Sequence, residues 1–421
     1  MRYRQRVLGM LFLLSIVTYI DRVCISVAGP RMQSELGISP EQWGWVVGMF
    51  ALAYAAFEIP TGSMGDRIGP RKVLTRIVLW WSAFTSLTGA VSSYIALLGT
   101  RFLFGAGEAG AYPNESASIS RWFPSAERGR AHGVVWMASR IGGILSPVLV
   151  VPIQARYGWR MSFYVFGVLG VIWAAAWFAW FRDNPAEKKA VTKRELEEIG
   201  PPAASHKTLP WGQVLRRPNL WWIMVMYHTY CWGSFFYLSW LHTFLVKGRG
   251  FSEAEIAAYS WLPFAFGGTA NFLGGFVSDR LVRRWGLKWG RRAVGLSGLA
   301  ASALFITATM TTQDKIASVV FLALGYAGSD FMLPVAWAVC LDVGRNYAGA
   351  VTGAMNTAGQ IGSFLTSVAF GYLVSAFGSY DAPLVPMAVM TAISALLWLK
   401  IDPSVELVPE QARKPVMARA A

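Results

Sequence analysis

Long apolar runs recur along the chain, and they restrict its fold more than any other feature. The segments 73–90 and 163–181 are two examples. Each is close to the roughly 20 residues that a helix needs to cross a hydrocarbon core of about 30 Å. Only 14% of the residues are charged, whereas soluble domains have about 25%. These observations predict an all-α integral membrane protein whose helices are surrounded by lipid.

Hydropathy predicts twelve membrane-spanning helices in two groups of six, separated by a polar segment. The spans are 6–30, 42–64, 72–92, 95–118, 130–153 and 160–181, followed by 219–246, 253–279, 291–311, 315–341, 347–376 and 382–402. We therefore expect a six-helix half at 1–181, a cytoplasmic linker at 182–217, a second six-helix half at 218–403 and a cytoplasmic tail at 404–421.

The positive charges lie in alternate loops. The chain has 38 Lys and Arg against 23 Asp and Glu, a net charge of +15. Basic clusters occur at 2–6, 67–76, 121–130, 182–194 and 280–292, whereas the intervening loops carry isolated cations. This asymmetry predicts that the clusters and both termini face the cytoplasm. The net charge is thus an orientation signal. We expect a protein of a bacterial inner membrane that functions as a monomer and has no nucleic-acid partner.

The two predicted halves share a repeated motif. Gly62-x-x-x-Asp66-Arg67-x-Gly69-x-Arg71 follows the second span, and Gly275-x-x-x-Asp279-Arg280 recurs 213 residues later. Duplicated six-helix halves with a site between them at the membrane midplane are typical of secondary transporters. The motif resembles the signature of the major facilitator superfamily, and this resemblance implies a latch that closes the cytoplasmic side. The latch residues would be Gly62, Asp66, Arg67, Gly69, Arg71, Asp279 and Arg280.

Few ionisable residues lie inside the predicted spans. Each is expected to have an interaction partner or a functional role, because a charge at mid-bilayer costs at least about 2.5–3.5 kcal/mol. They are Asp21, Arg22, Glu58, Arg101, Glu108, Glu115, Arg140 and Asp330. Arg101, Glu108 and Glu115 are seven residues apart, which places them on one helix face that cannot point toward lipid. We expect that face to line a cavity, with structural roles for Glu115 and Arg140.

A narrower resemblance rests on the first, fourth and eleventh spans. Its motifs are Tyr19-Ile-Asp21-Arg22, Arg101-Phe with Gly107-Glu108-Ala, and Asn356-x-x-Gly359-Gln360. They resemble the anion:cation symporters, which include bacterial sugar-acid carriers and the animal sialic acid and vesicular glutamate carriers. The resemblance extends over most of the chain. It implies proton-coupled import of an organic anion, with a sugar acid such as a hexonate or hexuronate as the expected substrate.

The resemblance also implies residue roles, in which Arg22 and Arg101 hold the substrate carboxylate while Asp21 and Glu108 carry the proton. A guanidinium suits the first role because it stays charged and offers forked donors to a carboxylate. Substrate binding at the arginine weakens its pull on the neighbouring carboxylate, which then holds a proton more readily, and this linkage is reciprocal. Further expected substrate contacts, with helix–helix hydrogen bonding as the alternative, are Tyr19, Tyr54, Asn356 and Gln360.

Other functions fit the sequence less well. A carrier of a monocarboxylate or an aromatic acid would use the same arginines. A drug:proton antiporter usually has Gly-Pro-x-x-Gly-Gly in its fifth helix, where residues 140–147 read RIGGILSP. A passive uniporter would differ only in whether Glu108 couples a proton. The sequence lacks a metal-ligand set, a nucleophile with a base and a phosphate-binding loop, so we expect no enzymatic activity and no cofactor.

Two positions depart from the family pattern. Glu58 stands before Ile59-Pro60 where a glutamine is expected, so it either adds a titratable site or lines the inner vestibule. His242 follows Leu241 where the family usually has proline. We expect it to meet interfacial water, with pH sensing as the alternative.

Overall fold

The computed structural model describes residues 2–200, 211–344 and 348–408, and at positions 59, 63, 66, 67, 125, 126, 128–130, 348 and 349 it describes the backbone only. The first helices are α1 (Tyr3–Leu36), α2 (Pro40–Ile68), α3 (Pro70–Ala90), α4 (Tyr94–Glu108), α5 (Ala111–Trp122), α6 (Ser125–Tyr157) and α7 (Trp159–Trp180). Three short elements follow, namely η1 (Pro185–Glu187), α8 (Lys193–Ile199) and α9 (Trp211–Val214). The remaining elements are α10 (Pro218–Ser234), α11 (Phe236–Ser239), α12 (Leu241–Thr243), η2 (Phe244–Gly248), α13 (Glu253–Tyr259), α14 (Leu262–Met310), α15 (Lys315–Gly344), α16 (Ala348–Phe377) and α17 (Leu384–Leu397).

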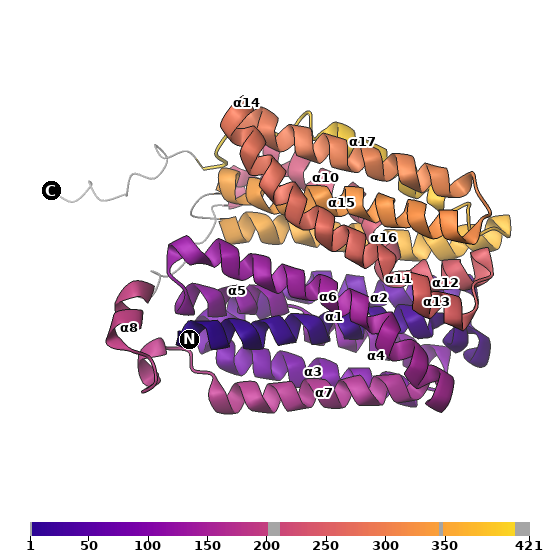
Figure 1. Ribbon diagram of the computed structural model, residues 1–421, viewed down its shortest axis with the longest axis horizontal. Helices are drawn as coiled ribbons and strands as arrows, with labels where there is room; N and C mark the ends of the chain where they lie inside the picture. The colour runs from indigo at the N-terminus through magenta and orange to yellow at the C-terminus, as the bar shows by residue number, and fades with distance from the viewer. Residues whose placement is uncertain (1, 201–210, 345–347, 409–421) are drawn as a thin grey trace.

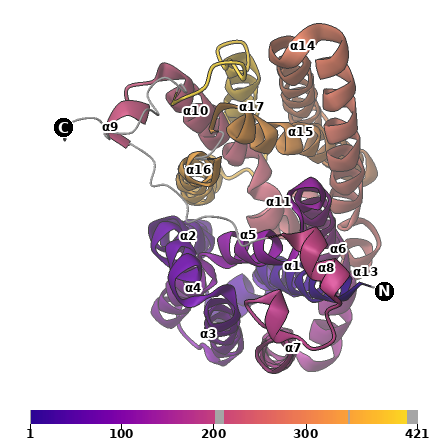
Figure 2. The same ribbon diagram turned by 90° about the vertical axis from the view of Figure 1, so that its left-hand side faces the viewer.

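The long helices form two bundles whose rods run along the longest axis of the molecule (Figure 1). Helices α1–α7 make up one bundle, which we call the first half, and α10–α17 make up the second half (Figure 2). Six segments of the described residues are long and apolar enough to cross a membrane by length and composition. The predicted all-α fold with two helical halves is confirmed. Helix α1 begins and helix α17 ends at one end of the bundle, which we call the termini end, and the opposite end is the far end (Figure 1).

Two glycines interrupt rods that would otherwise be continuous. Gly110 has φ 85° and separates α4 from α5, so the single span predicted at 95–118 is two helices. Gly286 has φ 76° and divides α14 into two rods. A left-handed backbone of this kind is readily adopted only by glycine. The break at Gly110 makes Glu108 the last residue of α4 and places Glu115 on a separate helix.

The segment that follows the first half docks onto its termini end through α8. The carboxylate of Glu195 accepts hydrogen bonds from the backbone N–H groups of Tyr3 at 3.1 Å and Arg4 at 2.9 Å. The Arg4 side chain is buried and pairs with Glu127 at 2.8 Å and Glu198 at 3.0 Å. Glu195 thus satisfies two of the unpaired donors at the start of α1, where a negative charge also stabilises the helix dipole.

The predicted latch is described only in part. The side chains of Asp66 and Arg67 lie outside the described residues. Gly69 has φ 87° and is the N-cap residue immediately before α3, and the backbone N–H of Arg71 donates to Asp183 at 2.9 Å. Asp183, which the sequence analysis did not single out, therefore provides a carboxylate at this helix N-terminus, where negative charge is favoured.

The second copy of the motif lies in α14. Asp279 pairs with Arg291 at 3.1 Å, and Arg291 also contacts Asp342 of α15 at 3.2 Å. Arg280 is exposed. In the first copy, Gly62 faces Pro113 of α5 closely enough that a Cβ atom there would lie 3.1 Å from the proline ring. The close approach explains the glycine, whereas the latch function stays a prediction.

The two halves contact each other at the far end. Gln33 of α1 accepts a hydrogen bond from Lys247 at 3.0 Å and donates one to Thr243 at 3.1 Å. Arg31 forms an ion pair with Glu253 of α13. The neighbouring parts of α2 and α16 are also packed together. These contacts close the space between the halves on the far side.

Candidate functional site

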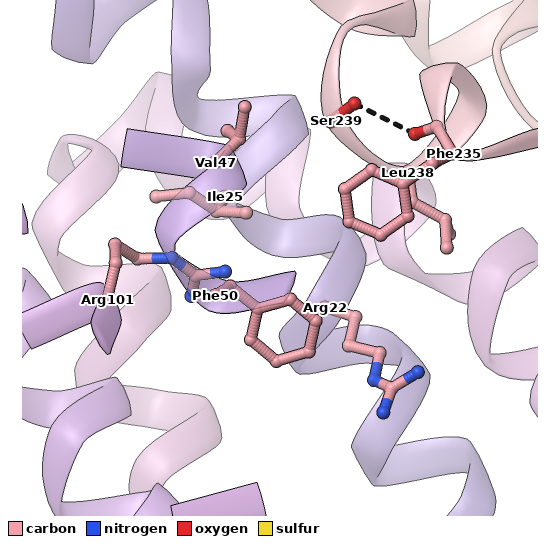
Figure 3. A pocket seen from close by; sticks show the side chains of 8 residues that line it. All are labelled: Arg22, Ile25, Val47, Phe50, Arg101, Phe235, Leu238 and Ser239. Carbon is pink, nitrogen blue, oxygen red and sulfur yellow. Dashed lines mark hydrogen bonds between the residues drawn. The ribbon is translucent and has the colours of Figure 1, made fainter. Parts of the chain in front are cut away.

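A small cavity lies between the halves, where α1, α2 and α4 face α11. It is lined by Arg22, Ile25, Val47, Phe50, Arg101, Phe235, Leu238 and Ser239 (Figure 3). The space left for the centres of water-sized molecules is about 10 Å³, which corresponds to about one water molecule. Any larger ligand therefore requires the lining to move apart.

Two arginines supply the positive charge of the cavity, Arg101 being buried and Arg22 partly buried. The ring of Phe50 lies between them, with its centroid 5.3 Å from Cζ of Arg22 and 5.2 Å from Cζ of Arg101 (Figure 3). Within the described part of the chain, Nη2 of Arg22 and Nε of Arg101 have no hydrogen-bond partner. The sequence prediction that these arginines share one site agrees with this geometry, and their unpaired donors suit an anion.

Glu108 neutralises one of the two arginines. Its Oε1 atom lies 2.5 Å from Nε of Arg22, and both side chains are almost completely buried. No ion pair of Arg101 is found among the described residues. The cavity therefore has one paired arginine and one that lacks a direct carboxylate partner.

Asp21 lies beside this pair in α1 and is buried. Neither of its carboxylate oxygens has a hydrogen-bond partner among the residues that the structure describes. Arg101, Glu108 and Trp81 surround it. A buried carboxylate without donors is costly as a charge, so Asp21 is chemically suited to the predicted proton-carrying role.

The two predicted tyrosines surround Arg22 rather than line the cavity. The ring centroid of Tyr54 is 5.1 Å from Cζ of Arg22, and that of Tyr19 is 5.7 Å away. The hydroxyl of Tyr19 accepts a hydrogen bond from Arg140 at 3.3 Å. Their contact with a substrate stays a prediction.

The predicted amides of α16 also lie outside the cavity lining. Asn356 donates a hydrogen bond of 2.7 Å to Glu58, which joins the second half to α2 of the first half. The second oxygen of Glu58 and Oε1 of Gln360 have no partner in the described residues. Glu58, at which the sequence departs from the family pattern, therefore forms a bond across the seam between the halves.

A buried ion pair forms a second bridge between the halves. Arg140 of α6 donates from Nη2 to Oδ1 of Asp330 at 2.9 Å, and its Nε lies 2.7 Å from Oδ2. Asp330, in α15, is fully buried. Both residues are among the intramembrane charges recognised from the sequence, and a structural role was expected for Arg140, but their pairing was not predicted.

An aromatic cluster lies on the termini side of this ion pair. Trp136, one helical turn before Arg140, packs edge-to-face on Trp337 of α15 with centroids 5.1 Å apart. Tyr112 of α5 stacks on Trp136 at 4.9 Å. Contacts between the halves thus lie on both sides of the cavity.

One other ionisable group, His242, is placed differently from the sequence expectation. His242 is buried, and its Nδ1 lies 3.0 Å from the hydroxyl of Ser26, so the expectation that it meets interfacial water is wrong. Glu115 is also buried, and it accepts a hydrogen bond from Ser15 at 3.4 Å. His228 bonds the carbonyl of Ala358 at 3.0 Å.

The apolar lining was missed by sequence reasoning. Phe50, Phe235 and Leu238 are ordinary residues for a membrane span, so their types carry no functional signal. Ser239 is the one uncharged polar residue of the lining, and its hydroxyl donates to the carbonyl of Phe235 at 2.8 Å (Figure 3).

Comparison with curated proteins finds carriers of organic anions. Residues 11–367 match the family model described as Major Facilitator Superfamily. A probable sulfoacetate transporter of Cupriavidus necator is 37% identical over 406 residues, which cover 95% of this chain and 94% of that protein. A hexuronate transporter of Bacillus subtilis is 29% identical over 379 residues, or 88% of each chain. A probable galactarate/D-glucarate transporter of Escherichia coli is 28% identical, covering 94% of this chain and 92% of the relative.

Solved structures share the fold. A bacterial homologue of the human lysosomal transporter Spinster, in an inward-facing and occupied conformation, has a TM-score of 0.78 at 21% identity, covering 95% of this chain and 97% of the other. A D-xylose–proton symporter has a TM-score of 0.76 at 16% identity, covering 94% and 98%.

Proposed function

This chain belongs to the major facilitator superfamily, and we propose that it imports a small organic anion together with protons across a bacterial cytoplasmic membrane. It is a multi-pass membrane transporter of organic anions rather than an enzyme. The proton coupling, the direction of transport and the identity of the anion are the proposed parts.

The ion pair between Glu108 and Arg22 beside Arg101 carries the proposal. An incoming anion binds Arg101 first, because that arginine has no ion-pair partner among the described residues. It then competes with Glu108 for Arg22. Once released, Glu108 is a buried carboxylate without a cation and takes up a proton, since an isolated charge is costly there. Anion and proton therefore favour each other's binding, as linkage requires.

Asp21 is the second proposed proton site. It lies near Arg101 of the cavity lining and near Glu108, the ion-pair partner of Arg22. Its two oxygens lack donors within the described chain. A proton on Asp21 would reduce the local negative charge and so favour the substrate, whereas its loss would favour release.

Transport requires the halves to separate on one side at a time. We propose that the termini end faces the cytoplasm, as the basic loops suggest. Opening to the outside would then break the contacts of Gln33 with Lys247 and Thr243. Opening to the inside would break the hydrogen bond between Glu58 and Asn356, and the repeated motif is proposed as the latch that opposes this step.

A short anion with two acidic groups is the substrate that the cavity supports best. Five of its eight lining residues are apolar and two are arginines. Ser239 is already bonded to a backbone carbonyl, so the lining offers few partners for several sugar hydroxyls. Sulfoacetate, for which the relative at 37% identity is named, has two acidic groups on a short carbon chain.

A sugar acid such as a hexonate or hexuronate is the second candidate. Relatives at 28% and 29% identity are named for hexuronate and for galactarate/D-glucarate. The unpaired amide oxygen of Gln360 would become a substrate contact if the cavity widened toward α16. A monocarboxylate or an aromatic acid would use the arginines alone.

Uptake into proteoliposomes tests the proposal. The panel contains sulfoacetate, a hexuronate, a hexonate, lactate, an aromatic acid and a neutral sugar, each with and without an inside-alkaline pH gradient. We expect accumulation of an acid only with the gradient, and none of the neutral sugar. Accumulation that is the same with and without the gradient would refute proton coupling. Uptake of no anion at all, with drug efflux driven by the opposite gradient, would refute the anion as substrate.

A further inference from the structure

Arg140 and Asp330 lie between the halves and have no part in the mechanism described above. We propose that Arg140 is a third anion contact, which Asp330 holds in this closed arrangement and releases to the second acidic group of the substrate. The inference rests on the proposed function and names the residue that would distinguish anions with two acidic groups from those with one.

The pair joins the two halves to each other. Arg140 comes from α6 of the first half and Asp330 from α15 of the second, and both are buried. The aromatic cluster of Trp136 and Trp337 covers the pair on the termini side. An ion pair between the two halves must break or rearrange whenever the halves separate at that point.

Tyr19 connects this pair to the cavity. Its ring centroid lies 5.7 Å from Cζ of Arg22 and also 5.7 Å from Cζ of Arg140. The two guanidinium carbons are therefore at most twice 5.7 Å, or 11.4 Å, apart. A short molecule with an acidic group at each end can bridge such a span, whereas a monoanion contacts one side only.

The pair is not fully satisfied in its present geometry. Only one hydrogen bond, from Nη2 to Oδ1, is well aligned. Nε of Arg140 and Oδ2 of Asp330 form no hydrogen bond within the described residues, although they are 2.7 Å apart. A carboxylate or sulfonate that approaches from the cavity can offer two aligned acceptors and so compete with Asp330 for the guanidinium.

Among the described residues, Asp330 has no second cation to take the place of Arg140. The titratable groups that face it in the described chain are Arg140 of α6 and the phenols of Tyr230 in α10, Tyr237 in α11 and Tyr326 in α15. The hydroxyl of Tyr237 already donates to a backbone carbonyl. Because an unpaired buried carboxylate is costly, Asp330 then takes up a proton from the open side. A dianion thus brings one more proton than a monoanion does.

Matched anions and a neutralised pair test this inference in proteoliposomes. The anion pairs are sulfoacetate with ethanesulfonate and D-glucarate with D-gluconate. The variant Arg140→Gln/Asp330→Asn removes both charges, so neither is left buried and alone. The matched control is Arg249→Gln/Asp381→Asn, which neutralises another arginine–aspartate pair, 2.5 Å apart, within the second half at the far end. Size-exclusion profiles verify that each variant folds.

We expect the wild-type protein to bind the dianion of at least one pair more tightly than its monoanion. The double variant should lower the apparent affinity for that dianion roughly tenfold or more, because it removes a charge-assisted contact. Its affinity for the monoanion, and both affinities of the control, should change by less than about twofold. Asp330→Asn alone should keep dianion uptake and remove one proton from the proton-to-dianion ratio.

The contrary outcomes separate the inference from the proposed function. Equal effects of the double variant on dianion and monoanion would show that the pair only holds the halves together. Wild-type uptake of monoanions alone would also overturn the inference while leaving proton–anion symport intact. Absence of gradient-driven uptake of every anion by the wild-type protein would overturn the proposed function itself.

Discussion

Glu108→Gln gives the most direct test of the coupling mechanism. In the wild-type site the ionised carboxylate competes with the substrate for Arg22, to which it is bonded at 2.5 Å. Glutamine keeps the shape and an acceptor oxygen for the guanidinium, but it removes the charge. The variant should therefore bind the anion more tightly than the wild-type protein in alkaline buffer. In acidic buffer, where Glu108 carries a proton, the two affinities should converge.

The structure sets the size of this effect. Taking the charge centres as roughly 4 Å apart at an effective dielectric constant of about 20, the attraction is about 4 kcal/mol. Screening by water is small, because the Arg22 side chain is 10% exposed and that of Glu108 is 1% exposed. The glutamine oxygen retains a hydrogen bond worth about 1 kcal/mol. The remaining 3 kcal/mol or so corresponds to a roughly hundredfold gain in affinity at alkaline pH.

Calorimetric titration with sulfoacetate and with a hexuronate, in nanodiscs at acidic and alkaline pH, measures this change. Exchange of labelled substrate across proteoliposomes should persist in the variant, whereas accumulation driven by the pH gradient should fall. Glu115→Gln is the matched control, because Glu115 is also buried but is bonded by the hydroxyl of Ser15. Because Glu115 forms no ion pair with Arg22 in the described chain, this variant should change the affinity and its pH dependence much less than Glu108→Gln does.

Weaker binding by Glu108→Gln at every pH would refute the competition between Glu108 and the substrate. Glu108 would then contact the anion itself or hold Arg22 in its binding position. Loss of exchange together with accumulation would point to the same conclusion.

Three further predictions concern other parts of the molecule. Arg101→Ala should weaken binding of every anion by roughly tenfold to a hundredfold in the same titrations, since it removes a charged contact; unchanged affinity would remove Arg101 from the site. Glu195→Ala should reduce the hydrogen-exchange protection of the first turn of α1 about tenfold. The carboxylate of Glu195 accepts two backbone hydrogen bonds there, at 3.1 and 2.9 Å, and losing this cap costs about 1 kcal/mol. Full protection in the variant would show that α8 does not cap α1. Gly110→Ala should lower the thermal midpoint of unfolding, because φ is 85° and a Cβ atom would lie 2.7 Å from Oγ1 of Thr61, at a backbone cost of roughly 1–2 kcal/mol; Gly133→Ala, which has open space around it, is the control and should not.

Much of the fold follows from local sequence properties. Hydropathy and helix period are local, and a helix in lipid satisfies its own backbone hydrogen bonds, so apolar runs predict spans without knowledge of their neighbours. The same reasoning located the intramembrane charges, because each is conspicuous in an apolar segment. It failed at the fourth span, where Gly110 breaks the helix, since an isolated glycine is also tolerated within a continuous helix.

The pairing of the charges depended on tertiary structure. Sequence reasoning brought Arg22, Arg101, Asp21 and Glu108 to one site, yet it did not determine which arginine Glu108 holds. The partner of Arg140 was equally open, because Asp330 lies 190 residues away in the other half. Such choices depend on how each helix is rotated about its axis and how deeply it sits in the bundle, and packing against neighbours sets both.

The cavity lining also combines residues that were recognised from the sequence with residues that only the tertiary structure revealed. An arginine in a membrane span is conspicuous because of its cost, and so Arg22 and Arg101 were candidates from the sequence. Phe50 and Leu238 complete the cavity, but apolar residues are common on every face of such helices. By itself the sequence determined which segments enter the membrane and which of their residues carry charge. Only the packing of the helices, within and between the two halves, decided which of those charges meet, because contacts between distant helices are a property of the assembled bundle.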